Sequence, residues 1–120
     1  MTSENIKRKI AVIFATDVVG YSTSMEANEV QTLKNLKSCK KILEDLFLHH
    51  DGHVFNTAGD SVLAEFSSAV SAVVCASEFQ KLIRERNKSV ENFQKMEFRI
   101  GINMGDVVKE DGNLYGEGVN

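Results

Sequence analysis

The sequence predicts an α+β domain in which one antiparallel sheet carries both of its helices on the same face. Three observations predict it. Short strand-like runs occur near the start, in the middle and near the end of the chain, and two long segments with helical apolar spacing separate them. The resulting order is β-α-β-β-α-β plus an added strand, the ferredoxin-like arrangement. We expect a lead-in at residues 1–9 and one domain at residues 10–120, long enough for a substantial core.

The first strand is the apolar, β-branched run that begins at Ile10, a pattern typical of a strand buried on both faces. It ends at a single carboxylate, Asp17, which is followed by a small loop holding Gly20 and Ser22. A carboxylate followed by exposed backbone N–H groups suits a metal-bound polyphosphate. The other interpretation is that Asp17 only ends the strand or begins a turn, and this segment alone does not decide between them.

The two predicted helices cover residues 26–50 and 69–86, each with one apolar stripe. We expect Gly52 to end the first helix in a left-handed conformation, and Ser67 or Ser68 to cap the start of the second. Between the helices, residues 54–57 and 61–66 read as two strands joined by a tight turn. This hairpin carries Asp60 at its tip.

The last predicted strand, at residues 97–103, alternates between apolar residues and a set that contains Arg99. Residues 87–95 before it are polar and predict a surface loop. After it we expect a turn at residues 104–106, a short hairpin partner at residues 107–108 and a further turn at residues 111–113. Residues 114–120 begin an element that the chain does not finish.

Composition excludes several classes of function. A net charge of −3 without a cluster of Lys and Arg argues against a nucleic-acid partner. The apolar run after Lys9 is too short for a signal peptide or a membrane span. Cys39 and Cys75 lie within helical patterns and are interpreted as reduced core residues of a cytoplasmic protein. The histidines at positions 49, 50 and 53 are interpreted as a solvated helix end, because no carboxylate or thiol has matching ligand spacing.

The predicted topology makes the first strand and the hairpin neighbours, so that Asp17 and Asp60 can lie side by side. Two carboxylates about 4 Å apart repel by about 4 kcal/mol at an effective dielectric constant of 20. A shared proton or divalent cations must offset that repulsion. With a phosphate-sized loop beside the pair, cations are the better choice, because two metals can activate an attacking oxygen and neutralise a leaving polyphosphate.

Four segments together resemble the class III nucleotidyl cyclases, most closely the bacterial adenylate/guanylate cyclase domains. They are FATDVVGYS at residues 14–22, NTAGDSVLAEF at 56–66, FRIGIN at 98–103 and NLYGEGVN at 113–120. Each motif alone is modest, but four in order at fitting separations are specific and cover nearly the whole chain. A diguanylate cyclase is a poorer match, because its Gly-Gly-Asp/Glu-Glu-Phe hairpin is replaced here by AGDS at residues 58–61.

The resemblance implies a role for each matching residue. Asp17 and Asp60 match the two metal-binding aspartates, and the backbone carbonyl of Val18 matches a further ligand for two divalent cations, Mg²⁺ or Mn²⁺. The loop residues Gly20, Tyr21 and Ser22 match the N–H groups that hold the β- and γ-phosphates. Arg99 matches an arginine that contacts the polyphosphate. Asn120 matches the asparagine that orients the ribose.

Two departures from the family pattern affect substrate choice and activity. Asn56 and Asn113 stand where adenylyl members usually carry Lys and then Asp or Thr, and where guanylyl members carry Glu and Cys. An amide can pair with either purine edge, so the base is poorly determined and ATP is preferred over GTP on general likeness alone. Family members also continue past Asn120 to a transition-state arginine that this chain lacks. Since such a charge is typically worth about 10²- to 10³-fold in rate, we expect the chain by itself to be nearly or fully inactive.

The function implied is conversion of ATP to 3′,5′-cyclic AMP and pyrophosphate at the interface of a homodimer, in cyclic nucleotide signalling. In this family the metals and phosphate loop come from one subunit and the base and transition-state groups from the other. The alternative is a catalytically inactive cyclase-like module that dimerises or senses a nucleotide. Asn56 and Asn113, which match neither the adenylyl nor the guanylyl pattern, favour the alternative. Retention of two mutually repelling carboxylates favours the enzyme.

Overall fold

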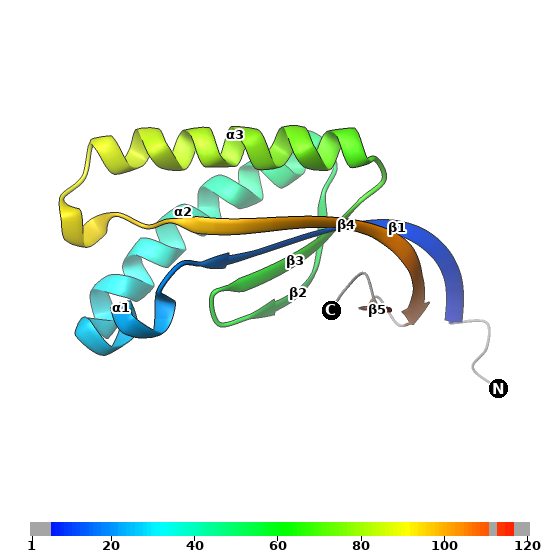
Figure 1. Ribbon diagram of the computed structural model, residues 1–120, viewed down its shortest axis with the longest axis horizontal. Coiled ribbons are helices and arrows are strands. Elements are labelled where there is room, and N and C mark those ends of the chain that lie inside the picture. Colours follow the sequence, from blue (N-terminus) through cyan, green and yellow to red (C-terminus); the bar gives the residue numbers. More distant parts are fainter. Residues whose placement is uncertain (1–5, 111–112, 117–120) are drawn as a thin grey trace.

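The computed structural model describes residues 6–110 and 113–116 (Figure 1). Its elements, in chain order, are β1 (Ile6–Val18), α1 (Tyr21–Ala27), α2 (Glu29–His50), β2 (His53–Ala58), β3 (Ser61–Phe66), α3 (Ala69–Lys88), the 3₁₀ turn η2 (Asn92–Gln94), β4 (Phe98–Glu110) and β5 (Asn113–Tyr115). The strands form one antiparallel sheet in the order β2-β3-β1-β4-β5. The central position of β1 between β3 and β4 confirms the predicted ferredoxin-like α+β fold.

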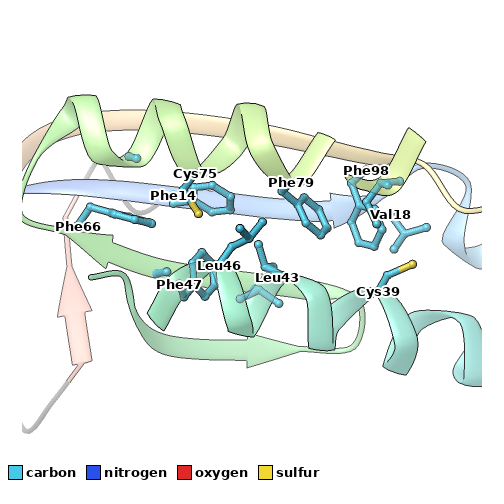
Figure 2. Close-up of a cluster of buried hydrophobic side chains, with 14 of the residues drawn as sticks. Phe14, Val18, Cys39, Leu43, Leu46, Phe47, Phe66, Cys75, Phe79 and Phe98 are labelled. Carbon is cyan, nitrogen blue, oxygen red and sulfur yellow. The ribbon is translucent and has the colours of Figure 1, made fainter. Parts of the chain in front are cut away.

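The core lies between the sheet and the helices α2 and α3. Alternate residues of β1, among them Val12 and Phe14, face the helices. The Phe14 ring meets Phe47 of α2 with centroids 5.2 Å apart and Phe66 of β3 at 5.7 Å, so one aromatic cluster joins three elements (Figure 2). Figure 2 also shows Cys75 in this core; the thiol is buried and not disulfide-bonded.

The opposite face of the sheet has no helix over it in the described part of the chain (Figure 1). At one end it is covered by the curl of the sheet itself, where the edge strands β2 and β5 contact each other. There Ile13 and Val107 are buried with Leu114 of β5, and Phe55 of β2 packs against them. The end of the same face that holds the last residues of β1 stays open.

Sequence patterns placed the start of the first long helix three residues too early, at residue 26 instead of Glu29. A separate helix, α1, precedes it, and the two are divided by Asn28, whose extended backbone (φ −160°) interrupts the helical path. The Asn28 side chain accepts a hydrogen bond from the Gln31 N–H, so Asn28 caps the start of α2. The expected start at residue 26 was therefore wrong, because residues 26 and 27 belong to α1 and Asn28 separates them from α2.

The helix end also differs from expectation. Asp51, not Gly52, takes the left-handed conformation, with φ 60° and ψ 40°. Gly52 is needed for space instead, since a Cβ added to it would lie 2.6 Å from the Phe66 ring and 3.0 Å from Phe47. At the other predicted cap, Ser68 and not Ser67 accepts the hydrogen bond from Ser71 N–H.

The predicted turn at residues 104–106 was wrong. β4 runs without interruption to Glu110, because β1 begins at Ile6, earlier than expected, and offers it a partner throughout. Gly105 lies directly opposite Ala11 in this ladder. The predicted turn at residues 111–113 lies partly outside the described residues, and Asn113 itself begins β5. Within the described residues, none of the helices is long and apolar enough to cross a membrane.

Candidate active site

The open end of the uncovered face holds a shallow depression of about 310 Å³. Three adjacent strands line it: β1 supplies Asp17, β3 supplies Ser61 and Leu63, and β4 supplies Arg99 and Gly101. Strand alternation explains this composition. Residues of β1 and β4 that flank these positions in sequence face the helices, so their neighbours must face away from them.

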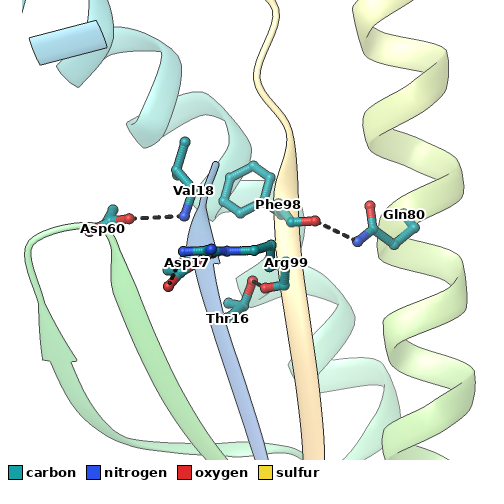
Figure 3. Close-up of polar contacts among 7 residues, drawn as sticks. All are labelled: Thr16, Asp17, Val18, Asp60, Gln80, Phe98 and Arg99. Atoms are coloured by element: carbon teal, nitrogen blue, oxygen red, sulfur yellow. Dashed lines mark hydrogen bonds and ion pairs between the residues drawn. The ribbon is translucent and has the colours of Figure 1, made fainter. Parts of the chain in front are cut away.

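Asp17 is held by an arginine from the neighbouring strand. Asp17 and Arg99 are directly opposite in the β1–β4 ladder. The Arg99 guanidinium donates through Nε to Oδ1 at 2.9 Å and through its terminal nitrogen to Oδ2 at 3.0 Å, a two-point contact (Figure 3). These hydrogen bonds and the charge of Asp17, with a smaller contribution from Asp60, raise the pKa of Arg99. Both oxygens of Asp17 thus have a partner.

Asp60 reaches the same point from the hairpin tip. Gly59, with φ 56°, makes the tight turn between β2 and β3. The Oδ2 atom of Asp60 accepts a hydrogen bond from the Val18 backbone N–H at 2.9 Å (Figure 3). The Asp60 carboxylate therefore contacts the peptide unit that joins Asp17 to Val18. As predicted, folding brings the two acidic residues to one place.

Polar contacts that sequence reasoning missed hold β4 and the β2–β3 turn in place. The Thr16 hydroxyl donates to the Arg99 carbonyl at 2.7 Å, and Gln80 of α3 donates from Nε2 to the Phe98 carbonyl at 2.9 Å (Figure 3). Lys40 of α2 donates to the Gly59 carbonyl at 3.3 Å. Thr16 was the detectable signal, as a polar residue inside an apolar run, whereas Gln80 and Lys40 gave none.

The loop after β1 is the start of α1. Gly20 precedes the helix with φ 68°, a conformation that glycine adopts easily. The Tyr21 ring packs against the core, whereas Ser22 is exposed. The first backbone N–H groups of any helix lack partners within the helix. The segment 20–22 therefore presents N–H groups next to Val18 and hence near Asp60.

The three asparagines that the sequence assigned to the site, Asn56, Asn113 and Asn120, differ in their relation to it. Asn56 is exposed on β2 and lies opposite Leu63, which lines the depression. Asn113 starts β5 opposite Glu110, at the end of β4 remote from Arg99, and its side chain accepts a hydrogen bond from the Leu114 N–H. Asn120 lies outside the described residues. Of the two that the structure describes, Asn56 is the one on a strand next to the depression.

The donor set fits a small divalent cation. Mg²⁺ prefers oxygen ligands and is commonly held by one or two carboxylates, with water and substrate phosphates completing its shell. Among the residues that the structure describes, no group of three or more His, Cys, Asp or Glu is clustered. Asp17 and Asp60 with neighbouring backbone carbonyls therefore suit a cation that arrives together with a phosphate ligand, and they suit zinc poorly.

A family profile, a curated relative and solved structures point to the same family. A profile of the adenylate and guanylate cyclase catalytic domain matches residues 2–113. A putative adenylate cyclase 3 of Rhizobium meliloti (strain 1021) is 43% identical over the whole chain, which spans 21% of that relative's length. The crystal structure of an adenylate/guanylate cyclase/hydrolase from Silicibacter pomeroyi is similar at a TM-score of 0.88 and 36% identity, covering 97% of this chain and 68% of that one. That of the guanylyl cyclase Cya2 is similar at 0.82 and 28%, covering 95% and 67%.

Proposed function

The chain belongs to the adenylate and guanylate cyclase catalytic domain family, and on this premise we propose that it carries the metal- and phosphate-binding half of a nucleotidyl cyclase active site. The substrate proposed is ATP and the products are 3′,5′-cyclic AMP and pyrophosphate. The observation that carries the proposal is the contact of Asp60 with the Val18 N–H, because it puts the second carboxylate beside Asp17.

The proposed reaction is attack of the ribose 3′-hydroxyl on the α-phosphorus with departure of pyrophosphate. Asp17, Asp60 and the Val18 carbonyl would hold two divalent cations. When bound, these cations would lower the pKa of the attacking hydroxyl and neutralise charge on the polyphosphate. The N–H groups at residues 20–22 would bind the β- and γ-phosphates, since they lie at the start of α1, where backbone N–H groups have no partner within the helix.

The distance to Asn113 supports a site shared by two chains. Arg99 and Glu110 are eleven residues apart along β4, and the strand curls towards its Glu110 end (Figure 1). Asn113, opposite Glu110, is therefore remote from Asp17 of its own chain. A homodimer in which each chain supplies Asn113 and Asn120 to the other would complete two equivalent sites.

Calorimetry with a non-hydrolysable ATP analogue tests the binding half of the proposal. We expect the analogue to bind only when Mn²⁺ is present, and Asp17→Asn or Asp60→Asn to weaken that binding at least tenfold. Asp45→Asn removes the same charge from an exposed position on α2 and is the matched control. Analogue binding that ignores Mn²⁺, or that survives both site substitutions, would contradict the proposal.

Catalysis is tested in a chain extended to the length of the solved relatives. Cyclic nucleotide formation from ATP and from GTP measures base preference directly. If the site is shared, a mixture of Asp17→Ala and Asn120→Ala chains regains activity that neither variant has alone. Metal-dependent analogue binding without product from either triphosphate would instead favour the nucleotide-sensing module.

A further inference from the structure

We propose that Arg99 acts as an internal cation that occupies the Asp17 carboxylate until a divalent cation replaces it. The inference rests on the proposed function and concerns how the same site is loaded. It assigns Arg99 two successive partners, first Asp17 and then the polyphosphate. Cation binding is then an exchange reaction, in which the incoming ion must displace a bound guanidinium.

The geometry of the ion pair carries this inference. Arg99 contacts both Asp17 oxygens at 2.9 and 3.0 Å, so its N–H groups occupy a lone pair on each oxygen and its positive charge competes with an incoming cation. Asp60 differs, because among the residues that the structure describes it accepts one hydrogen bond, from the Val18 N–H to Oδ2, and its Oδ1 atom has no such partner there. The two carboxylates are therefore unequal, and only Asp17 has to be released.

The surroundings let Arg99 move without disturbing the fold. Its side chain is 69% exposed and that of Asp17 is 37% exposed, so neither is locked by packing. The backbone at Arg99 is fixed separately, since the Thr16 hydroxyl holds its carbonyl. Only the side chain has to turn, and it turns within a depression that is already open.

The exchange ties cation binding to phosphate binding. A guanidinium displaced from one carboxylate keeps five donors and a fork geometry that matches phosphate oxygens equally well. A nucleotide whose phosphates accept hydrogen bonds from Arg99 would therefore favour release of Asp17 from the ion pair. Release of Asp17 in turn favours binding of the cation. Each ligand is then expected to raise the affinity for the other by the same factor.

The first test is Mn²⁺ affinity without nucleotide, measured by calorimetry on the purified protein. Arg99→Met removes the competitor, so we expect binding about five-fold tighter than in the wild type, roughly 1 kcal/mol. Arg84→Met removes the same charge from an exposed position on α3, over the other face of the sheet, and should leave the affinity unchanged. Equal affinity in the wild type and Arg99→Met would overturn the exchange.

A second measurement follows the guanidinium itself. The Arg99 Nε–H signal in ¹⁵N NMR, assigned through Arg99→Lys, should be protected from water exchange in the protein alone. Diamagnetic Mg²⁺ should abolish that protection, and Asp17→Asn should abolish it without any metal. Saturation with Mg²⁺ that leaves the signal unchanged would overturn the inference.

Failure of the inference and failure of the proposed function give different results. If the wild type binds Mn²⁺ and Asp17→Asn does not, while Arg99→Met equals the wild type, the metal site stands and the exchange is wrong. If neither the wild type nor Arg99→Met binds Mn²⁺, both the metal site and the exchange are wrong.

Discussion

The two faces of the sheet differ although the same strands make both. On β1, Phe14 lies in a dry aromatic cluster beneath the helices, and Asp17, three residues later, lies in an open depression on the other side. Packing therefore fixes one set of residues, while charge and access define the other. Substitutions at different positions of one strand are therefore expected to change the stability of the fold and the ligand binding of the site separately.

The largest effect that would sharpen this comparison is expected from Phe14→Ala. The side chain is fully buried between α2 and β3, so its loss should lower the free energy of unfolding by about 3–5 kcal/mol. Urea denaturation followed by circular dichroism measures it. Leu48→Ala, at an exposed position near the end of α2, is the control and should cost less than about 0.5 kcal/mol. Similar losses for both would mean that this face is not tightly packed.

A smaller loss is expected when a methyl group is added on the covered face, and almost none when it is added on the open face. Gly52→Ala puts a Cβ against Phe66 and Phe47 and should destabilise by about 1–3 kcal/mol. Gly101→Ala meets nothing within 4 Å and should leave the free energy of unfolding nearly unchanged. The same denaturation assay compares them. A tolerant Gly52 would show that the aromatic cluster can shift.

The buried thiol of Cys75 is expected to make the free energy of unfolding depend on pH, an effect that arises on the covered face alone. Burial and, to a lesser extent, Glu78 raise the pKa of Cys75 to about 11, against 9.0 for an unperturbed thiol. Between these values the unfolded chain releases the proton and the folded protein keeps it. The free energy of unfolding therefore falls as pH rises from 9 towards 11, by at most about 1.4 kcal/mol per pH unit. Denaturation at pH 8 and pH 10 should show a smaller fall in Cys75→Ala, and identical falls would contradict the assignment.

Only a small effect on stability is expected from Asp17→Asn. An exposed ion pair is typically worth less than about 1 kcal/mol, so the free energy of unfolding should change by no more than that. The same variant is expected to lose Mn²⁺ binding. A loss of stability above about 2 kcal/mol would break the comparison, because the open face would then also be holding the fold together.

The meeting of Asp17 and Asp60 was predictable, because topology alone decides it. Once the order of strands and helices is recognised, β1 and the hairpin must be neighbours, and a strand end then lies beside a hairpin tip. The pairing of Asp17 with Arg99 was not predictable. Alternation gives the face on which a residue lies, but the register that sets two residues opposite each other depends on the full ladder.

The errors had local causes that tertiary contacts overrode. Residues 104–106 combine glycine and aspartate, which favour a turn, yet pairing with the early part of β1 keeps them extended. At the end of α2, the preference of glycine for a left-handed conformation pointed to Gly52. The residue in that conformation is Asp51, and position 52 holds a glycine because the Phe66 ring leaves no space for a side chain. The conformational propensity of a residue describes its own backbone and gives no information about the side chains packed around it.

The longest ladder among the described strands joins β1 to β4, with Ile6 opposite Glu110 and Val18 opposite Phe98. Contacts between residues so distant in sequence give a high contact order, and closing such large loops is entropically unfavourable until other contacts form. We therefore expect the β2–β3 hairpin and the helices to form first and the β1–β4 ladder to form late in folding. Since that ladder aligns Asp17 with Arg99, the site would be among the last parts of the protein to assemble during refolding.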